Sequence, residues 1–214
     1  MIASLACLLA LADKRVVGEK WQYLLTWHYF GKDINTTDEE SFDVEVTKVF
    51  PESVTLKVSQ KLTATILDEQ RIPTDPKAVP ATHEWALSPS GSVAFMPNAR
   101  FGLESRFYRI LKGVMPEPKG DTVRDQEWTI EYADDGLGMP LARLRSQFSK
   151  ALKDGKEYLV GYREQNGTNG IGRFVRAEKT PFPSYLEMKF TNTKMQGGTD
   201  TVDCDFTMRL KAQK

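Results

Sequence analysis

The sequence is poor in the residues that build metal centres and disulfide frameworks, and it has no excess of charge of either sign. Its 214 residues include two cysteines and two histidines, and 29 basic side chains balance 29 acidic ones, so the formal net charge is zero. Basic and acidic residues are interspersed, whereas a nucleic-acid-binding domain carries a basic patch or stripe. We therefore expect no nucleic-acid partner, and the same balance argues against electrostatic attachment to acidic membranes.

The cysteines and histidines are not arranged for metal binding or nucleophilic catalysis. Cys204 alternates with polar residues along residues 201–211, which places its thiol on the apolar face of a strand. His28 and His83 are scattered, and a zinc site needs three or four protein ligands. The sequence also has no Gly-x-Ser-x-Gly elbow. From these absences we predict that the protein binds no metal and no cofactor and is not an enzyme.

Long apolar runs are absent except at the N-terminus. Residues 1–12 are almost wholly apolar and end in Ala10-Leu11-Ala12, the pattern of a secretory signal peptide with its small-residue cleavage site. No lysine or arginine precedes the run, so either the signal is incomplete or the true start lies upstream. We expect an exported protein, periplasmic or extracellular and not an integral membrane protein, with residues 13–214 as a single β-rich domain. A buried or frayed N-terminal strand is the alternative.

Period-two alternation is the strongest pattern that is present. Between residues 54 and 66, six of the seven even positions are apolar and none of the six odd positions is, as in a strand with one buried face. At about 3.3 Å per residue such a strand is roughly 40 Å long, about twice the usual length. We therefore expect it to bend around a core or a cavity.

Two further segments are candidate strands of the sheet. One strand is predicted at residues 20–30, where apolar and aromatic side chains occupy the odd positions: Trp21, Tyr23, Leu25, Trp27 and Tyr29. Residues 141–152 fit either a helix or a strand that turns at Asp154-Gly155. We favour the strand, because the neighbouring segments form a meander.

One segment has the spacing of an amphipathic helix near residues 99–112. Its apolar face is made by Leu103, Phe107, Ile110 and Leu111. Asn98 precedes it as a possible cap, and Gly113 stands just past its predicted end.

The predicted fold class is therefore mainly β. We expect a curved antiparallel meander sheet, as a half-barrel or an open barrel, with one packed α-helix. Residues 18–113 and 120–212 also echo each other weakly, since each begins near a tryptophan-bearing strand. This echo is either an old duplication or chance.

A short linker carries a resemblance to known proteins. Residues 115–123 read Met-Pro-Glu-Pro-Lys-Gly-Asp-Thr-Val, follow the predicted helix and lead to Trp128. They resemble a linker in uncharacterised exported bacterial β-rich proteins. In layout the chain is similar to lipoprotein-carrier-like half-barrels, in which a curved sheet wraps a helix and an apolar cavity. That similarity implies a periplasmic role in holding or shielding an apolar ligand or lipid chain, and it carries over no functional residue.

The candidate binding residues are aromatic and apolar side chains of the first strand and the helix. Such side chains are ordinary core residues of a strand, but they also suit the wall of an apolar cavity. On the second interpretation the wall consists of Trp21, Tyr23, Trp27, Tyr29, Phe107 and Leu111.

Three functions are consistent with these patterns. The first is a non-catalytic exported protein that binds or shields an apolar ligand or a lipid chain in a sheet cavity. The second is an envelope module for protein–protein interaction or structural support. A remote third is a carbohydrate-active enzyme that uses Asp203 and Asp205, which share a strand face about 7 Å apart.

Overall fold

The computed structural model describes residues 15–88, 93–95, 103–116, 126–133, 140–177, 180–194 and 201–213. The predicted signal peptide at residues 1–12 lies outside the described residues. So do Cys7, Asn98, and residues 99–102 of the predicted helix.

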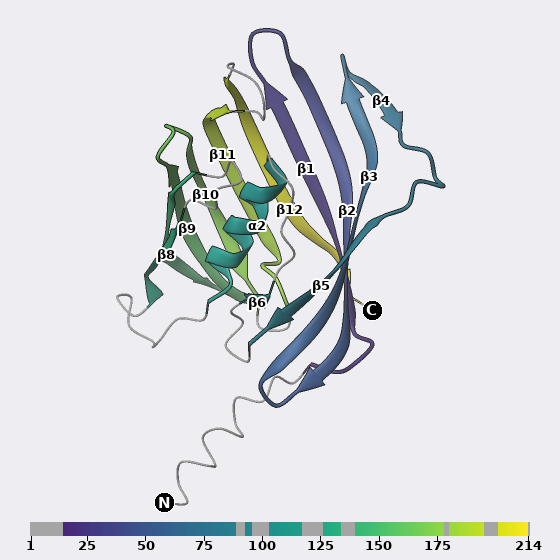
Figure 1. The fold of residues 1–214 in the computed structure, drawn as a ribbon, viewed down its shortest axis with the longest axis vertical. Coiled ribbons are helices and arrows are strands. Elements are labelled where there is room, and N and C mark those ends of the chain that lie inside the picture. The colour runs from purple at the N-terminus through teal and green to yellow at the C-terminus, as the bar shows by residue number, and fades with distance from the viewer. Residues whose placement is uncertain are drawn as a thin grey trace, which may run out of the picture.

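One antiparallel sheet contains all the described strands (Figure 1). They are β1 (Lys20–Phe30), β2 (Asn35–Phe50), β3 (Ser53–Leu67), β4 (Gln70–Pro73), β5 (Ala81–Leu87), β6 (Val93–Phe95), β7 (Trp128–Tyr132), β8 (Ala142–Leu152), β9 (Gly155–Glu164), β10 (Asn169–Arg176), β11 (Tyr185–Lys194) and β12 (Thr201–Gln213). The order across the sheet is β6-β5-β3-β2-β1-β12-β11-β10-β9-β8-β7, and β4 pairs with β3 beside this path. The sheet does not close into a barrel. The predicted fold class, a mainly β open meander with one packed helix, is confirmed.

In the middle of the sheet, the first described strand, β1, pairs with the last, β12. β1 pairs with β12 over its whole length, from Trp21 opposite Gln213 to Phe30 opposite Asp203. β12 also pairs with β11. Strands β1 to β6 therefore lie on one side of this pairing and β7 to β11 on the other, and β12 links them.

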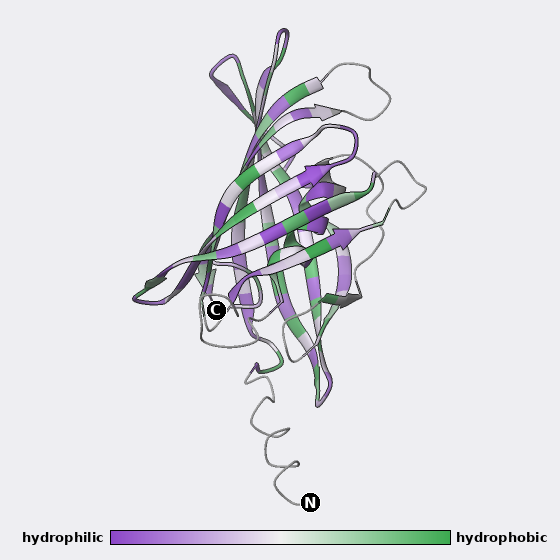
Figure 2. Cartoon of the chain, turned by 90° about the vertical axis from the view of Figure 1, so that its left-hand side faces the viewer, coloured by the Kyte–Doolittle hydropathy of each residue, from purple (hydrophilic) through white to green (hydrophobic). Residues whose placement is uncertain are grey.

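Alternation of side chains along the strands determines which face is inner. In β1 the odd-numbered side chains from Trp21 to Trp27 are buried, whereas Gln22 is exposed. Figure 2 shows hydrophobic and hydrophilic residues alternating along the strands. The apolar residues collect on the inner face, as the period-two pattern predicts.

The prediction of one uniform buried face for residues 54–66 fails at Leu62, although Ala64 farther along the strand is buried. Val54, Leu56 and Val58 are buried, but Leu62 is exposed. The register of β2 against β3 shifts at this point, since Glu39 pairs with Ala64 and Glu40 pairs with Leu62. A bulge of this kind disturbs the alternation locally, and no residue type in the strand signals it.

A single described helix, α2 (Leu103–Val114), packs on the inner face of the sheet (Figure 1). It ends two residues later than predicted, and Gly113 lies inside it rather than past its end. A Cβ at Gly113 would lie 2.5 Å from Tyr132 Oη and 2.8 Å from Leu144 Cδ1. The glycine therefore permits close approach of the helix to β7 and β8, and it does not end the helix.

Residues 142–152 form strand β8, as we favoured over a helix. Leu144 and Ser146 are buried, whereas Arg143 and Arg145 are exposed, so burial alternates with the period of a strand. β8 turns into β9 at Gly155, where φ is +153°. A Cβ there would lie 2.2 Å from the carbonyl oxygen of Arg176, so this turn presses against the end of β10.

Candidate functional site

The central part of the inner face is filled by aromatic packing between the sheet and α2. The Trp27 ring lies 4.2 Å from the Phe206 ring and 5.9 Å from the Phe107 ring, centroid to centroid. Phe107 also meets Phe42 edge-on at 5.7 Å. Edge-on and tilted pairs at these distances are typical of a dense aromatic core.

The structure brings together the six residues predicted as a cavity wall. Trp21, Tyr23, Trp27, Phe107 and Leu111 are buried, and Tyr29 is partly buried and stacks on Trp27. Their contact with a ligand stays a prediction, because each packs in the apolar core and α2 lies over the sheet at this point.

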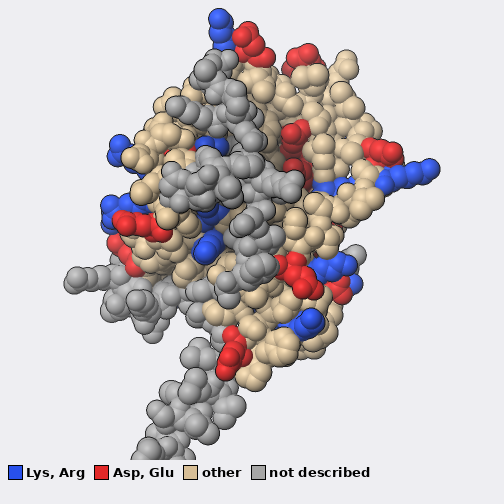
Figure 3. Space-filling view, in the orientation of Figure 1, with Lys and Arg blue, Asp and Glu red and all other residues tan. Residues whose placement is uncertain are grey.

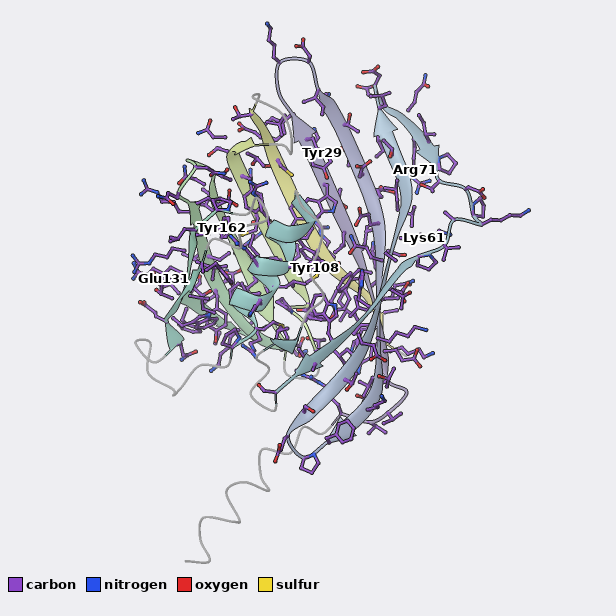
Figure 4. The ribbon with its side chains drawn as sticks, in the orientation of Figure 1. Tyr29, Lys61, Arg71, Tyr108, Glu131 and Tyr162 are labelled. Carbon is purple, nitrogen blue, oxygen red and sulfur yellow. The ribbon has the colours of Figure 1, made fainter. Side chains whose placement is uncertain are left out.

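A buried ion pair and two tyrosines hold α2 against the sheet. Arg106 donates from Nε and Nη2 to the two carboxylate oxygens of Glu164, at 2.7 and 2.9 Å, and the Tyr162 hydroxyl donates to Glu164 Oε1 at 2.9 Å. On the other side of the helix, the Tyr108 hydroxyl donates to Gln60 Oε1 at 3.2 Å. Figure 4 shows Tyr162 and Tyr108 on either side of α2. Burial alone would raise the pKa of Glu164, but its bonds to Arg106 and Tyr162 lower that pKa below its ordinary value.

A pocket of about 500 Å³ opens at one end of the sheet, beyond the C-terminal end of α2. We call it the end pocket. Its walls come from the end of α2, the β8–β9 turn, the start of β9, the β10–β11 connection and Arg15. The lining residues are Arg15, Val114, Met115, Ala151, Leu152, Lys153, Gly155, Lys156, Tyr158, Arg176, Ala177, Thr180, Pro181, Phe182 and Pro183. A volume of this size is within the range of small-ligand sites.

Among the residues that the structure describes, the charged side chains that line the end pocket are all cationic. They are Arg15, Lys153, Lys156 and Arg176. Arg176 and Lys156 are directly opposite each other on β10 and β9, an arrangement in which like charges repel. The Arg176 guanidinium is steadied by a bond from Nη1 to the carbonyl oxygen of Pro116.

Phe182 is one of the buried core side chains that line the end pocket. The β10–β11 connection folds inward at Pro181, Phe182 and Pro183, all of which are buried. The Phe182 ring lies 5.2 Å from the Trp85 ring and 5.7 Å from the Phe42 ring. Its carbonyl oxygen accepts bonds from the Thr180 hydroxyl at 2.6 Å and the Tyr23 hydroxyl at 3.4 Å. Phe182 therefore forms part of the partition between the open and the filled part of the interior, together with Val114, Met115 and Tyr158.

His28 and Asp205, two of the residues considered for catalysis or metal binding, are directly opposite each other on β1 and β12. His28 Nε2 shares a hydrogen bond of 2.9 Å with Asn35 Oδ1. Asp203 Oδ1 accepts the backbone N–H of Asn192 at 3.0 Å, and Asp205 is opposite Lys189. Burial raises the pKa of the Cys204 thiol to about 12, so this cysteine is a poor nucleophile. Among the residues that the structure describes, no cluster of His, Cys, Asp and Glu could hold a metal ion.

The outer face carries two adjoining hollows, of about 510 and 660 Å³, on strands β8 to β11. Both are lined by Arg145, Gly161 and Ile171. The side chains of Leu159 and Ile171 are half or more exposed there. Arg145 and Arg173 pair with Glu127 and Glu187, respectively. Charges of both signs are likewise scattered over the face seen in Figure 3.

The end pocket was missed by sequence reasoning, because its parts are far apart in the chain. Arg15, Lys156 and Arg176 meet only after the strands pair. The one local signal is the Pro181-Phe182-Pro183 sequence, in which an aromatic residue stands between two prolines within a connection.

Comparisons with known proteins show a shared fold and no family. No protein-family model matches the chain, and no curated protein matches it. Among solved structures, the chain is similar to lipovitellin, whose structure is described as showing lipid–protein interactions, with a TM-score of 0.54 at 9% identity. That match covers 93% of this chain but 26% of the lipovitellin chain. The half-barrel layout implied by the sequence resemblance is confirmed at the level of the fold.

A second similarity is weaker. A domain assigned as an outer membrane lipoprotein-sorting protein from Vibrio parahaemolyticus matches with a TM-score of 0.31 at 9% identity, over 98% of this chain and 89% of that one. No argument below depends on it. The described part of the chain has no helix with the length and apolar character needed to cross a membrane.

Proposed function

We propose that this chain is a non-catalytic exported protein that binds an amphiphile, with an apolar chain and an anionic head group, in the end pocket. The observation that carries the proposal is the composition of the lining. One side is apolar, with Val114, Met115 and Phe182, and the charged side chains at the pocket are cationic. Apolar walls with a few oriented charges are the usual design of a small-ligand site.

The fold supports the same proposal from a different direction. An open sheet whose inner face is apolar must cover that face, and here α2 covers its centre while the end pocket remains open. Lipovitellin, which shares the fold, has lipid–protein interactions according to its structure's description. Export is proposed from residues 1–12, which have the composition of a signal peptide.

Binding of dodecanoate, measured by isothermal titration calorimetry and native mass spectrometry, tests the proposal. We expect saturable binding of dodecanoate and much weaker binding of dodecanol, which has the same chain but no charge. Replacement of both Lys156 and Arg176 by glutamine should weaken dodecanoate binding by about tenfold or more, since two charge-assisted contacts are lost.

Two further variants separate the pocket from the rest of the surface. Ala151→Glu puts a carboxylate on the exposed part of the wall and should abolish dodecanoate binding by repulsion. Arg145→Gln on the outer face should leave it unchanged. Equal binding by all these variants, or no binding by the unaltered chain, would reject the proposal.

The wall of Trp21, Tyr23, Trp27, Tyr29, Phe107 and Leu111 is proposed as a deeper part of the same site. A ligand would reach it only if Phe182 or α2 moved. Fluorescence quenching by a bromine-labelled fatty acid tests this. The Trp128 ring centroid is 5.3 Å from that of Tyr158, which lines the end pocket, whereas Trp27 packs on Phe107. Quenching that disappears in Trp128→Phe limits the ligand to the end pocket. Quenching that disappears in Trp27→Phe extends the site to the wall.

A second candidate function is protein–protein interaction through the outer face. The hollows around Gly161, with Leu159 and Ile171 exposed beside them, favour it, because exposed apolar patches mark interaction sites. Ile171→Lys should then abolish self-association or partner binding in sedimentation-velocity experiments without changing dodecanoate binding. A chain that is monomeric and partner-free in both forms would count against it.

A further inference from the structure

Large apolar side chains protrude at the end of the sheet that holds the end pocket. Val16 and Val17 are 61% and 59% exposed, Phe50 at the β2–β3 turn is 53% exposed, and Leu152 at the β8–β9 turn is 39% exposed. The strand register places these segments at one end. Lys20 pairs with Glu45 near the start of β1, Phe50 with Ser53, and Leu152 with Gly155. Three segments that are remote in sequence thus surround the pocket end.

The two ends of the sheet differ in charge. Among the described residues, the pocket end carries Arg15, Lys153, Lys156 and Arg176 at the pocket and Lys48 before the β2–β3 turn, against Glu19, Glu52 and Asp154, while Lys20 there is paired with Glu45. The opposite end also exposes apolar side chains, Leu67 and Ile72. Its turns, however, contain Asp33, Asp68 and Glu69 against Lys32, and Arg71 there is paired with Glu39. The pocket end is therefore the end at which exposed apolar side chains coincide with an excess of cations.

We propose that the pocket end of the sheet docks on an anionic lipid bilayer. Isolated apolar side chains on separate turns, with lysines among them, suit the headgroup region, where apolar tips enter the bilayer and lysines remain at its charged surface. The electrostatic part of such binding depends on anionic lipid. The charge balance of the whole sequence does not exclude this surface, because folding gathers the cations locally.

Docking at this end extends the proposed function. The opening of the end pocket would then face the headgroups, and an amphiphile would pass between bilayer and pocket without crossing water. The docking itself does not require the pocket to be filled, so the two proposals are tested separately.

Sedimentation with lipid vesicles tests the docking. The full chain is mixed with vesicles of phosphatidylcholine alone or of phosphatidylcholine with a third of phosphatidylglycerol. We expect binding to the anionic vesicles, weak binding to the neutral ones, and release near 1 M salt, where the Debye length is about 3 Å. The double variant Val17→Ser, Phe50→Ser should weaken partitioning about tenfold or more, because two apolar side chains no longer leave water.

Ile72→Ser is the matched control. Ile72 is 52% exposed, as Phe50 is, but lies at the acidic end, so the variant should partition as the unaltered chain does. All variants keep residues 1–12, so differences among them do not come from that apolar segment. Equal losses in the two variants, equal binding to both vesicle types, or no vesicle binding would overturn the proposal. Dodecanoate binding that is normal in Val17→Ser, Phe50→Ser shows that the pocket is intact, and its absence in the unaltered chain counts against the proposed function alone.

Discussion

The inner face of the sheet is filled by packed side chains at its centre but open at the pocket end. At the centre, α2 contributes Phe107 to a cluster with Trp27 and Phe206, and the Arg106–Glu164 pair fixes the helix in place. At the pocket end the helix has ended at Val114, and Phe182 of the β10–β11 connection is what meets the core. The lesson is that period-two strands specify an apolar face, while the covering segments decide whether that face becomes a core or a binding site.

Removal of the partition should have the largest effect on this contrast. Phe182→Ala deletes a buried ring packed on Trp85 and Phe42 and should lower the free energy of unfolding by about 3–5 kcal/mol, measured by urea denaturation. The end pocket should at the same time accept longer fatty acids. Leu152→Ala at the exposed rim is the control, with an expected loss below about 1 kcal/mol. A similar loss in both variants would contradict the role of Phe182 as a partition.

Breaking the ion pair should loosen the filled centre by a comparable or slightly smaller amount. Glu164→Gln leaves the Arg106 guanidinium buried without its carboxylate, which typically costs about 3–5 kcal/mol of stability. Urea denaturation measures this loss. Glu131→Gln removes the acidic partner of the exposed pair with Arg143, whose atoms are 4.0 Å apart, and should change stability by less than about 0.5 kcal/mol. Figure 4 shows Glu131 at the outer margin of the sheet. If the two variants were equally stable, the buried pair would not anchor the helix.

Lifting the helix from the sheet should have an intermediate effect. Gly113→Ala places a Cβ within 2.5 Å of Tyr132 Oη, and overpacking of this kind costs about 1–3 kcal/mol. Gly161→Ala is the matched strand control, because nothing lies within 4 Å of the Cβ it would add. We expect its thermal unfolding midpoint to be unchanged or slightly raised. A normal midpoint for Gly113→Ala would show that α2 can shift freely.

Acidification should have the smallest effect among these changes. The pKa of Glu164 is lowered in the folded chain, so its contribution to stability is fully present above the pKa that it has when unfolded. That contribution is lost as the pH falls through the folded pKa. Urea midpoints measured from neutral pH down to acid should therefore fall more steeply for the unaltered chain than for Glu164→Gln. Parallel curves would contradict a lowered pKa.

The fold could be predicted further from the sequence than the site could. Local alternation identified the strands that carry Trp21 to Trp27 and Val54 to Val58, because side-chain burial has a period of two in any half-buried strand. The bulge between Glu39 and Glu40 and the position of Gly113 inside α2 were not predictable. Both depend on how two elements meet, and neither residue type nor local spacing records that.

The candidate site illustrates the same limit more strongly. The aromatic residues of β1 were recognisable because they are adjacent on one strand. Lys156, Arg176 and Arg15 come from separate segments, and their proximity follows from strand order and register. A sheet in which β1 pairs with β12 is not visible in the alternation of either strand, so the pocket could not be assembled before the topology was known.

The position of β12 also has a consequence for how the chain folds during synthesis. Strands β1 to β6 can pair among themselves as soon as they are made, and β7 to β11 can do the same. The two halves become one sheet only when residues 201–213 emerge from the ribosome and insert between β1 and β11. Because this pairing joins residues that are nearly the whole chain apart, its closure entropy is large and its formation slow. Until then, the inner edges of both halves are open to chaperones and to mispairing.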